Sequence, residues 1–403
     1  MDERLFLPYD NSCGVKLEVS VSRAVKDGKF AFCCGQADMG SDGYPQRKYD
    51  LKSQTSISIK LMEDVFQKIN SSLEELVRVQ IHYINDGQLS ENEYQTYFES
   101  LLPENANPIL IFTPLPNLFY DGLSVEIDGI SCKEPNPKKT EIKKNVLCEL
   151  INAGGFIFSI FKSTSQGISL KNQVEEQFNY LMEKMDDLSI DQENILKIYT
   201  YYATEDKLDA IRKIATYRNT VFGSNIPPCS DVPVEQFNSD LQGEEFRLEV
   251  VMAKPGTRIR QLKHSDLSSA CQLPYSNRMD LAREANNFIF FATHHPYHND
   301  GELLYPGQIE KQTRYCMETM KEGLAYFGSD FTDMMKMTTF YKGNEKDFHN
   351  NLSIRNSYLR NPGAASTGVP LKHFTFPEQL IQVEGIACMK RTGLKLTDLS
   401  CKK

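Results

Sequence analysis

The sequence lacks any apolar run that could span a membrane. Its longest apolar stretches, residues 156–161 and 288–293, fall far short of the ~18–20 residues that a membrane-spanning helix requires. The first residues, Met1 to Arg4, include two acids and no long apolar stretch follows them, so we expect no signal peptide. Glycine-rich phosphate motifs and the Gly-x-Ser-x-Gly motif are also missing, and we therefore predict neither a cofactor nor a serine hydrolase.

Cysteine pairs at redox or metal-binding spacing are absent as well. The ten cysteines are scattered, and the only close pair is the adjacent Cys33 and Cys34. We interpret them as reduced, buried thiols and expect a cytoplasmic location. Histidines cluster once, at His294, His295 and His298, but adjacent strand residues point in opposite directions, so we predict no metal site.

Positive charge is in short supply. The chain has 45 Lys and Arg against 54 Asp and Glu, which gives a formal net charge of −9. Such a chain has no general attraction for phosphate backbones or anionic lipid, so we expect neither nucleic acid nor membrane as a partner. Its composition, 40% hydrophobic and 25% charged, is that of a globular protein, and 403 residues suffice for about two to four domains.

One pattern occurs three times along the chain. Each copy opens with a short aromatic strand after turn residues, and Gln54, Gln177 and Gln312 each open a helix. Apolar residues then recur at steps of three and four, which predicts one buried helix face per copy. These residues are Ile57, Leu61, Val65, Ile69, Leu73 and Leu76 in the first copy, Val174, Phe178, Leu181, Met185 and Leu188 in the second, and Cys316, Met320, Leu324 and Phe327 in the third.

Each copy continues with a second strand, a second helix and a final strand that carries an acid. The order of elements is therefore β-α-β-α-β, which predicts the α+β class with helices packed on a sheet. The first strands are expected at residues 30–34, 156–160 and 288–292, the second strands at 77–84, 195–202 and 334–341, and the second helices at about 91–102, 208–217 and 348–358.

The spacing between glutamine and acid supports the repeat. The interval from Gln177 to Glu249 in the second copy equals the interval from Gln312 to Glu384 in the third. In the first copy, Glu126 follows Gln54 at that same interval, and Asp128 lies two positions further on. Both acids are compatible, because strand positions two apart share one face. The predicted units are residues 1–132, 145–254 and 270–393, with connectors at 133–144 and 254–269 and a frayed tail after Gly393.

The motifs of these copies resemble a known family. They are Phe32-Cys33-Cys34-Gly35-Gln36, Gln54-Thr55, Leu115-Pro116 and Val125-Glu126-Ile127-Asp128-Gly129-Ile130 in the first copy, and Pro274-Tyr275-Ser276-Asn277, Gln312-Thr313, Arg355-Asn356 and Val383-Glu384-Gly385-Ile386-Ala387 in the third. The pattern resembles the Rid family of imine and enamine deaminases, also called YjgF or UK114 proteins, over nearly the whole chain. The second copy is the most divergent.

The resemblance implies a fold and an activity. Rid proteins are homotrimers with a central barrel of sheets, outer helices and ligand clefts between subunits. Three tandem Rid-like (chorismate mutase-like) units then imply an intramolecular pseudo-trimer that is a monomer with three non-equivalent clefts. The implied function is cofactor-free hydrolysis of reactive imines or enamines. A chorismatase-like hydrolase that releases pyruvate from chorismate, and a non-catalytic module that binds a ligand or partner, are the alternatives.

The resemblance also implies site residues. The family acid on the last strand matches Glu384, Glu249 and Asp128, which makes them the candidate catalytic residues. The arginine that pairs with the substrate carboxylate in deaminating members is missing, and Asn107 stands there in the first copy. Either another arginine substitutes, or the substrate differs, or the activity is lost. The candidate substrate-binding residues are Tyr275, Thr293, His294, Cys34, Gly35, Asn107 and Arg355.

Overall fold

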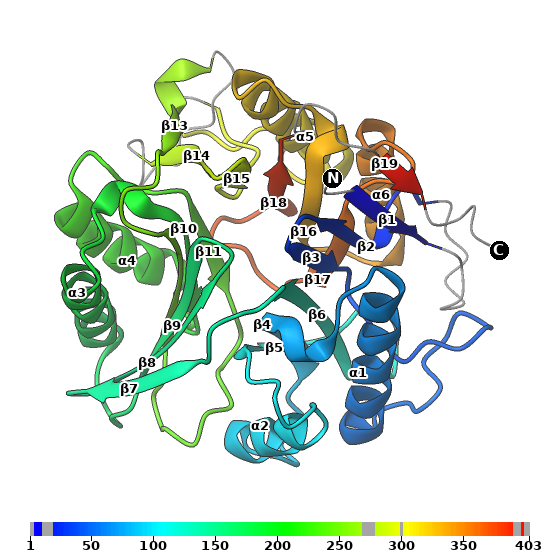
Figure 1. Cartoon of the computed structure of the whole chain (residues 1–403), viewed down its shortest axis with the longest axis horizontal. Helices are drawn as coiled ribbons and strands as arrows, with labels where there is room; N and C mark the ends of the chain where they lie inside the picture. Colours follow the sequence, from blue (N-terminus) through cyan, green and yellow to red (C-terminus); the bar gives the residue numbers. More distant parts are fainter. Residues whose placement is uncertain (1–3, 10–18, 268–278, 299–300, 390–395, 399–403) are drawn as a thin grey trace.

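Three groups of strands and helices follow one another along the chain, in a computed structural model that describes residues 4–9, 19–267, 279–298, 301–389 and 396–398 (Figure 1). The first unit (residues 4–132) contains β1 (Arg4–Pro8), β2 (Ser22–Asp27), β3 (Phe30–Cys33), α1 (Leu51–Lys68), β4 (Leu76–Ile84), α2 (Glu91–Ser100), β5 (Ile109–Leu115) and β6 (Val125–Cys132). The second unit (residues 139–253) contains β7 (Lys139–Lys143), β8 (Val146–Ala153), β9 (Phe156–Ser163), α3 (Leu170–Asp187), β10 (Ile195–Tyr202), α4 (Lys207–Phe222), β11 (Cys229–Pro233) and β12 (Phe246–Ala253). The third unit (residues 260–398) contains β13 (Arg260–Lys263), β14 (Asp280–Ala285), β15 (Phe288–Phe291), α5 (Ile309–Tyr326), β16 (Met334–Tyr341), α6 (Glu345–Tyr358), β17 (Ala365–Pro370), β18 (Ile381–Cys388) and β19 (Leu396–Asp398).

The three units share one strand order. It runs β2-β3-β6-β4-β5 in the first, β8-β9-β12-β10-β11 in the second and β14-β15-β18-β16-β17 in the third. The last two strands of each series are parallel and the others antiparallel. A single pairing of β17 with β2 joins the first and third sheets. Figure 1 shows the sheets facing the centre and the helices outside, which confirms the predicted α+β pseudo-trimer.

Phenylalanines from all three units meet at the centre. Phe30, Phe156 and Phe288, which begin the three aromatic strands, have ring centroids 5.2–5.6 Å apart. They belong to one hydrophobic cluster that draws residues from every unit, while three further clusters lie between each sheet and its own helices. Burial of these rings against one another fills the axis of the pseudo-trimer.

The predicted helix faces are confirmed in the second and third units and shifted in the first. Helix α1 buries Ile59, Met62 and Val65 among other residues, whereas Ile57 and Leu61 are only half-buried. The predicted face also ran on through Leu73 and Leu76, but the helix ends before them and Leu76 begins β4. No helix within the described residues is long and apolar enough to cross a membrane.

The repeated glutamine of the second unit is Gln173, not the predicted Gln177. Gln173 and its counterparts Gln54 and Gln312 are each the fourth residue of their helix. The Gln173 amide donates to the carbonyls of residues 168 and 243 and accepts from the backbone N–H groups of residues 245 and 246. Gln54 and Gln312 make the same type of clamp to the segment just before the strand that carries their acid.

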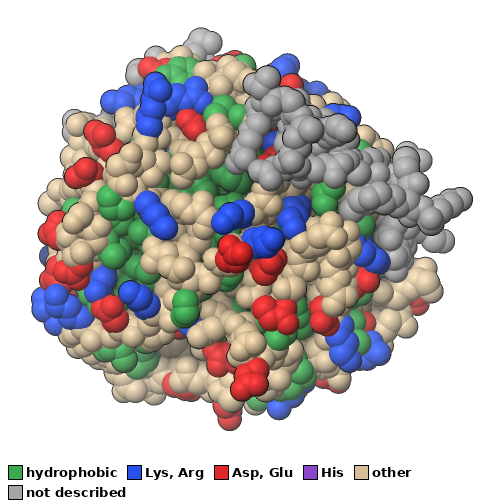
Figure 2. All heavy atoms as spheres, viewed as in Figure 1, with side chains coloured by type: hydrophobic (Ala, Val, Ile, Leu, Met, Phe, Trp, Pro, Cys, Tyr) green, Lys and Arg blue, Asp and Glu red, His purple; other side chains and the backbone are tan. Residues whose placement is uncertain are grey.

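Two predicted connectors and the tail contain strands. Residues 139–143 form β7, the exposed edge of the second sheet, and residues 260–263 form β13 beside β14. Residues 396–398 form β19, which pairs in parallel with β1. On the face shown in Figure 2, acidic and basic side chains are interspersed and no large patch of one sign forms.

Replacement of Gln173 by leucine should lower the free energy of unfolding by about 2–4 kcal/mol, because buried backbone groups of two segments lose their partners. Gln67→Leu, on the exposed face of α1, is the matched control and should change it by less than about 0.5 kcal/mol. Urea denaturation followed by circular dichroism measures both. Equal effects of the two substitutions would contradict the clamp.

Candidate functional site

The three candidate catalytic acids lie near the centre of the chain, where Asp128 and Glu384 line one small cavity. Asp128, Glu249 and Glu384 occupy equivalent positions in their sheets, opposite Gln80, Tyr199 and Thr338 respectively. Each is buried, and each pairs with a cation from a different unit: Asp128 with Lys336, Glu249 with Arg78, and Glu384 with Lys197. The cations are equivalent too, because each follows the bulge near the start of its strand. The three ion pairs therefore form a ring around the centre of the chain.

Hydroxyls and carbonyls complete these pairs. Lys336 Nζ lies 3.0 Å from Asp128 Oδ2 and donates to the Cys33 carbonyl, while Thr367 donates to the same carboxylate oxygen at 2.8 Å. Burial raises the pKa of Asp128, but the charge of Lys336, together with His82, Arg78 and the Thr367 hydrogen bond, leaves that pKa below its ordinary value. Ser230 plays the part of Thr367 for Glu384 and Lys197.

The Glu249 pair uses an arginine and a phenol. Arg78 binds Glu249 through two nitrogens, with Nη2 3.0 Å from Oε2, and the Tyr201 hydroxyl donates to Oε2 at 2.9 Å. A cavity of about 30 Å³ lies between the three pairs, enough for a water molecule but not for a substrate. The ring joins the units, and a catalytic role for its acids stays a prediction.

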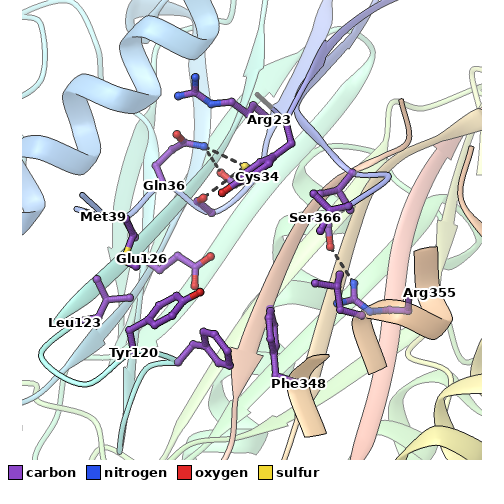
Figure 3. Close-up of a pocket in the computed structure, with 18 residues that line it drawn as sticks. Arg23, Cys34, Gln36, Met39, Tyr120, Leu123, Glu126, Phe348, Arg355 and Ser366 are labelled. Atoms are coloured by element: carbon purple, nitrogen blue, oxygen red, sulfur yellow. Dashed lines mark hydrogen bonds between the residues drawn. The ribbon is translucent and has the colours of Figure 1, made fainter. Parts of the chain in front are cut away.

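A larger pocket opens between the first and third units, and we call it the 1–3 cleft. Its cavity volume is about 150 Å³. In Figure 3, Cys34 and Gln36 lie on one side and Tyr120 and Phe348 on the other. Glu126 of the first unit and Arg355 of the third unit lie on opposite sides of the space between them (Figure 3).

Glu126 is the acid of the 1–3 cleft. It lies two residues before Asp128 on β6 and is half-buried, and no hydrogen bond or ion pair is recorded for its carboxyl group among the described residues. Burial, and next the negative charge of Asp128, raise the pKa of Glu126 to about 8. At neutral pH the group is therefore mostly protonated and is poised to donate or accept a proton.

Two arginines line the 1–3 cleft, Arg23 and Arg355, and Arg23 lies 3.9 Å from the Asp64 carboxylate. Arg355 is the second cation of the cleft. It comes from the last turn of α6, is 1% exposed, and hydrogen-bonds to Asn351 Oδ1 and Ser366 Oγ. No carboxylate of the described residues pairs with it, and burial lowers its pKa to about 10. A buried guanidinium without a counter-ion favours an anionic ligand, which restores the charge balance that burial removes.

The turn at Cys34-Gly35-Gln36 forms the third part of the 1–3 cleft. A Cβ atom on Gly35 would lie 1.7 Å from Glu126 Oε1, so only glycine allows the carboxyl group to rest directly on this turn. The Gln36 amide donates to the Cys34 carbonyl at 3.0 Å and fixes the turn. The lack of a side chain at residue 35 therefore positions Glu126.

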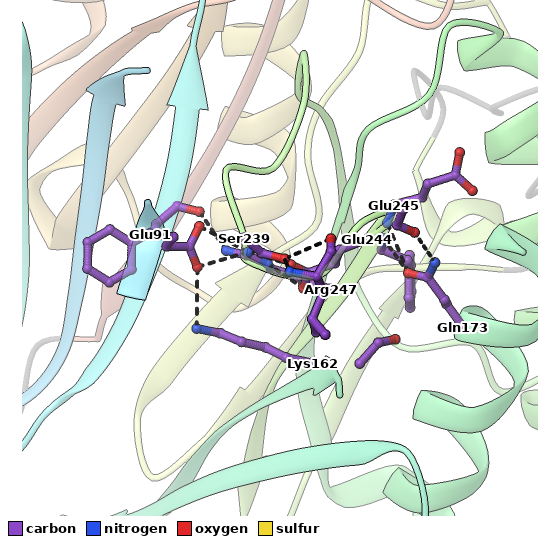
Figure 4. Close-up of polar contacts among 12 residues, drawn as sticks. Glu91, Lys162, Gln173, Ser239, Glu244, Glu245 and Arg247 are labelled. Atoms are coloured by element: carbon purple, nitrogen blue, oxygen red, sulfur yellow. Dashed lines mark hydrogen bonds and ion pairs between the residues drawn. The ribbon is translucent and has the colours of Figure 1, made fainter. Parts of the chain in front are cut away.

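The cleft between the first and second units, the 1–2 cleft, is filled by charged side chains. Arg247 occupies the position equivalent to Glu126 and pairs with Glu91 at 2.9 Å and Glu244 at 2.8 Å (Figure 4). It also donates to the Phe112 carbonyl and stacks on Phe237, 4.1 Å from the ring centroid. This internal network takes the space that a ligand would need.

The cleft between the second and third units, the 2–3 cleft, contains an arginine with a partner. Arg218 of α4 makes a bidentate pair with Asp231 at 2.8 and 3.2 Å. Gln382 stands at the Glu126 position and donates to the Asp231 carbonyl. The buried His294 ring has no hydrogen-bond partner within the described part of the chain, and burial lowers its pKa to about 3. Among the described residues, no three His, Cys, Asp or Glu side chains gather as metal ligands.

The 2–3 cleft and the 1–3 cleft differ in residue type at one equivalent position. Arg218 precedes Asp231 by the same interval by which Arg355 precedes Gly368. Asp231 and Gly368 also hold the same place in their sheets, opposite Thr200 and Thr339 respectively. Among the described residues, Arg355 therefore has no counter-ion, because glycine stands where the second unit has aspartate.

The sequence-predicted binding residues fall into four places. Cys34, Gly35 and Arg355 come together in the 1–3 cleft. Thr293 and His294 are buried beside the 2–3 cleft, where Thr293 hydrogen-bonds to Ser230. Asn107 is exposed before β5 and lines none of these clefts, and Tyr275 lies outside the described residues. Seven cysteines are described, and all of them are buried thiols.

The spacing of the sequence pattern is compatible with both Glu126 and Asp128, and the resemblance to the Rid family points to Asp128. The signal for Glu126 was its interval from Gln54, which matches the intervals in the other two copies. That interval alone does not identify the cleft acid, because in the second unit it was counted from Gln177. Ser366, Gly368 and the aromatic residues of the cleft carried no signal of their own in the sequence.

The family model described as Endoribonuclease L-PSP matches residues 268–389. Over these residues the third unit is similar to this family, also called the YjgF or Rid family. The predicted resemblance is thus confirmed, and the first two units share the strand order of the third. No curated protein matches the chain.

One solved structure shares the fold over most of the chain, and others are similar over about a third of it. A chorismatase is similar over 78% of this chain and 93% of its own, with a TM-score of 0.55 and 11% sequence identity. A YjgF/UK114-family protein from Mycobacterium tuberculosis is similar over 32% of this chain and 99% of its own, with a TM-score of 0.27 and 18% identity. The yeast protein YEO7 covers 33% of this chain and 100% of its own, with a TM-score of 0.29 and 19% identity. At these identities the chorismatase match establishes the pseudo-trimeric fold and not the activity.

The raised pKa of Glu126 predicts a pH-dependent stability. Between the unfolded pKa, near 4.5, and the folded pKa, about 8, only the folded chain holds this proton, so stability falls as pH rises through that window. Glu126→Gln removes the effect. The stability of the variant relative to wild type should therefore increase from pH 5 to pH 8 and level off above it. Urea denaturation across this range measures the difference, and a pH-independent difference would contradict the assignment.

Gly368→Asp should recreate the Arg218–Asp231 pair at Arg355. The new carboxylate neutralises the guanidinium, so binding of small carboxylates in the 1–3 cleft should weaken at least about 10-fold. Gly368→Asn, which has nearly the same shape and no charge, is the matched control and should weaken binding less. Calorimetric titration with a carboxylate measures both, and equal effects would show that bulk against Phe348, rather than charge, is responsible.

Proposed function

We propose that the chain hydrolyses an imine or enamine that carries a carboxylate, in the 1–3 cleft and without a cofactor. The observation that carries the proposal is the joint presence of a counter-ion-free buried Arg355 and a protonated Glu126 in one pocket of the described chain. The other two clefts are filled by Arg247 and by the Arg218–Asp231 pair. They serve as scaffold in this proposal.

Arg355 binds the substrate carboxylate. A guanidinium offers two parallel N–H donors that match a carboxylate, and burial strengthens the contact by excluding water. In this chain the arginine comes from helix α6 and hydrogen-bonds to Ser366 on β17. In this proposal Arg355 takes over the carboxylate-binding role of the arginine that is missing from the sequence pattern.

Glu126 moves the proton. Its protonated carboxyl group donates to the imine nitrogen, which makes the carbon more electrophilic. The resulting carboxylate then accepts a proton from the attacking water, which gives an amino alcohol. Glu126 returns this proton to the amine nitrogen and takes the hydroxyl proton as the C–N bond breaks and ammonia leaves. Overall, C=NH and water give C=O and NH₃. An enamine first takes a proton on carbon and then follows the same path.

The turn at Cys34-Gly35-Gln36 keeps the reacting groups close. Gly35 lets Glu126 lie against the backbone, and the buried Gln36 fixes the path of the chain there. Groups held at the correct geometry need no reorganisation during the reaction.

Ammonia release from 2-iminopropionate tests this proposal. Glu126→Gln should lower kcat at least about 100-fold, and kcat/KM of wild type should fall above pH 8 as the acid loses its proton. Arg355→Met should raise KM and leave the kcat/KM of an uncharged imine unchanged. Glu99→Gln, an exposed residue on α2, is the control for the first substitution. Loss of activity with Glu384→Gln but not with Glu126→Gln would instead favour the acid that the sequence first selected.

A second candidate is hydrolysis of chorismate with release of pyruvate. The similarity to a chorismatase over 78% of the chain favours it, and so does the arginine in an aromatic cleft. Incubation with chorismate and measurement of pyruvate decides between the two activities. If neither ammonia nor pyruvate is released, the non-catalytic ligand-binding alternative gains support. In each case we propose that the chain acts as a monomer, because its three units complete the ring of interfaces.

A further inference from the structure

The wall of the 1–3 cleft is aromatic and comes from two units. Phe119 and Tyr120 lie in the loop between β5 and β6 of the first unit, and Phe348 comes from α6 of the third. The ring centroids of Phe119 and Phe348 are 4.0 Å apart, so the two units close one side of the pocket together. Leu352 and Met39 add further apolar surface. This wall faces the turn at Cys34-Gly35-Gln36, against which the Glu126 carboxyl group rests (Figure 3).

The cavity has the size of a ring. Its volume of about 150 Å³ equals that of an apolar protein cavity that binds benzene, roughly 150 Å³. The side chain of 2-iminopropionate is a single methyl group and would leave most of this space unfilled. An unfilled apolar cavity loses the packing contacts that a ligand ring would supply.

The polar groups limit what kind of ring-bearing molecule fits. A purely apolar ligand would leave the Arg355 charge without a counter-ion. The second arginine of the lining, Arg23, already lies 3.9 Å from the Asp64 carboxylate, so a doubly charged phosphate would bring one negative charge more than Arg355 balances. A single carboxylate balances the charge of Arg355 and leaves Glu126 protonated.

We infer that the 1–3 cleft selects monocarboxylates whose apolar part is a six-membered ring or a group of similar size. The inference rests on the proposed function only for the reaction, where it names 2-imino-3-phenylpropionate and related imines as better substrates than 2-iminopropionate. Ring recognition by Phe119 and Phe348, and carboxylate recognition by Arg355, stand on the geometry of the cleft alone.

Binding of three unreactive probes tests the inference by isothermal titration calorimetry. 3-Phenylpropionate should bind about 10- to 100-fold more tightly than propionate, the range expected for burial of one aromatic ring. It should also bind at least about 10-fold more tightly than 3-phenylpropan-1-ol, which keeps the ring and lacks the charge. Equal affinity for 3-phenylpropionate and propionate, or no measurable binding of 3-phenylpropionate, would overturn the inference.

Variants separate ring from charge. Phe348→Ala should weaken the binding of 3-phenylpropionate about 10-fold and leave the binding of propionate unchanged. Arg355→Met should weaken the binding of both acids and leave the binding of the alcohol unchanged. Phe119→Leu serves in the same way if Phe348→Ala does not fold. Tyr326→Ala, an exposed aromatic residue on α5, is the control. If Phe348→Ala weakened the binding of both acids, Phe348 would support the fold of the pocket, and this result would count against ring recognition.

The two proposals fail in different ways. Equal kcat/KM for 2-iminopropionate and 2-imino-3-phenylpropionate would overturn ring selectivity and keep the deaminase. Tight binding of 3-phenylpropionate with no hydrolysis of either imine would retire the deaminase and support a site for ring-bearing carboxylates.

Discussion

Each unit of this chain buries a carboxylate that only another unit neutralises. Asp128, Glu249 and Glu384 are 2–5% exposed, and their cations arrive from the third, first and second units respectively. A buried charge that loses its partner destabilises a protein by about 3–5 kcal/mol, so a unit separated from its neighbours would carry an unpaired acid and an unpaired cation in its core. The ring of ion pairs therefore makes the pseudo-trimer an obligate arrangement and fixes how the sheets meet.

The clefts inherit their geometry from this ring. Glu126, Arg247 and Gln382 each lie two residues before a ring acid, and each therefore faces the parallel strand of a neighbouring unit. With the frame fixed, the fate of a cleft depends on the side chains at this position and on the strand opposite. Arg247 closes one cleft with Glu91 and Glu244, and Asp231 satisfies the arginine of the second. In the third cleft, the glycine at residue 368 leaves the space beside Arg355 open. No carboxylate of the described residues neutralises Arg355 there.

The sequence predicts the frame of this molecule better than its site. Strand and helix periodicity identified the repeated elements, since burial on one face leaves a regular pattern in any single unit. Periodicity does not distinguish Gln173 from Gln177, because residues four apart share a helix face. Only the contacts of Gln173 with residues 243–246 in the folded chain identify it as the repeated glutamine. The strand pattern does not distinguish Glu126 from Asp128 either, because both acids lie on the same strand face. They differ in that Asp128 pairs with Lys336, which belongs to another unit. Arg355 reaches the 1–3 cleft from helix α6, far in sequence from Glu126, and no spacing rule within one motif anticipates that the two meet.

Fusion of three units into one chain explains why only one cleft is open among those that the described residues form. In a homotrimer every substitution appears three times, so a residue that fills one cleft fills them all. In a single chain Arg247 and Asp231 add buried ion pairs at two interfaces without affecting the third, where Glu126 and Arg355 keep the groups that a ligand would meet. A buried charge without a counter-ion destabilises a fold, and among the described residues Arg355 carries such a charge at the 1–3 interface. The ring of ion pairs and the two filled clefts supply the stability that this one interface gives up.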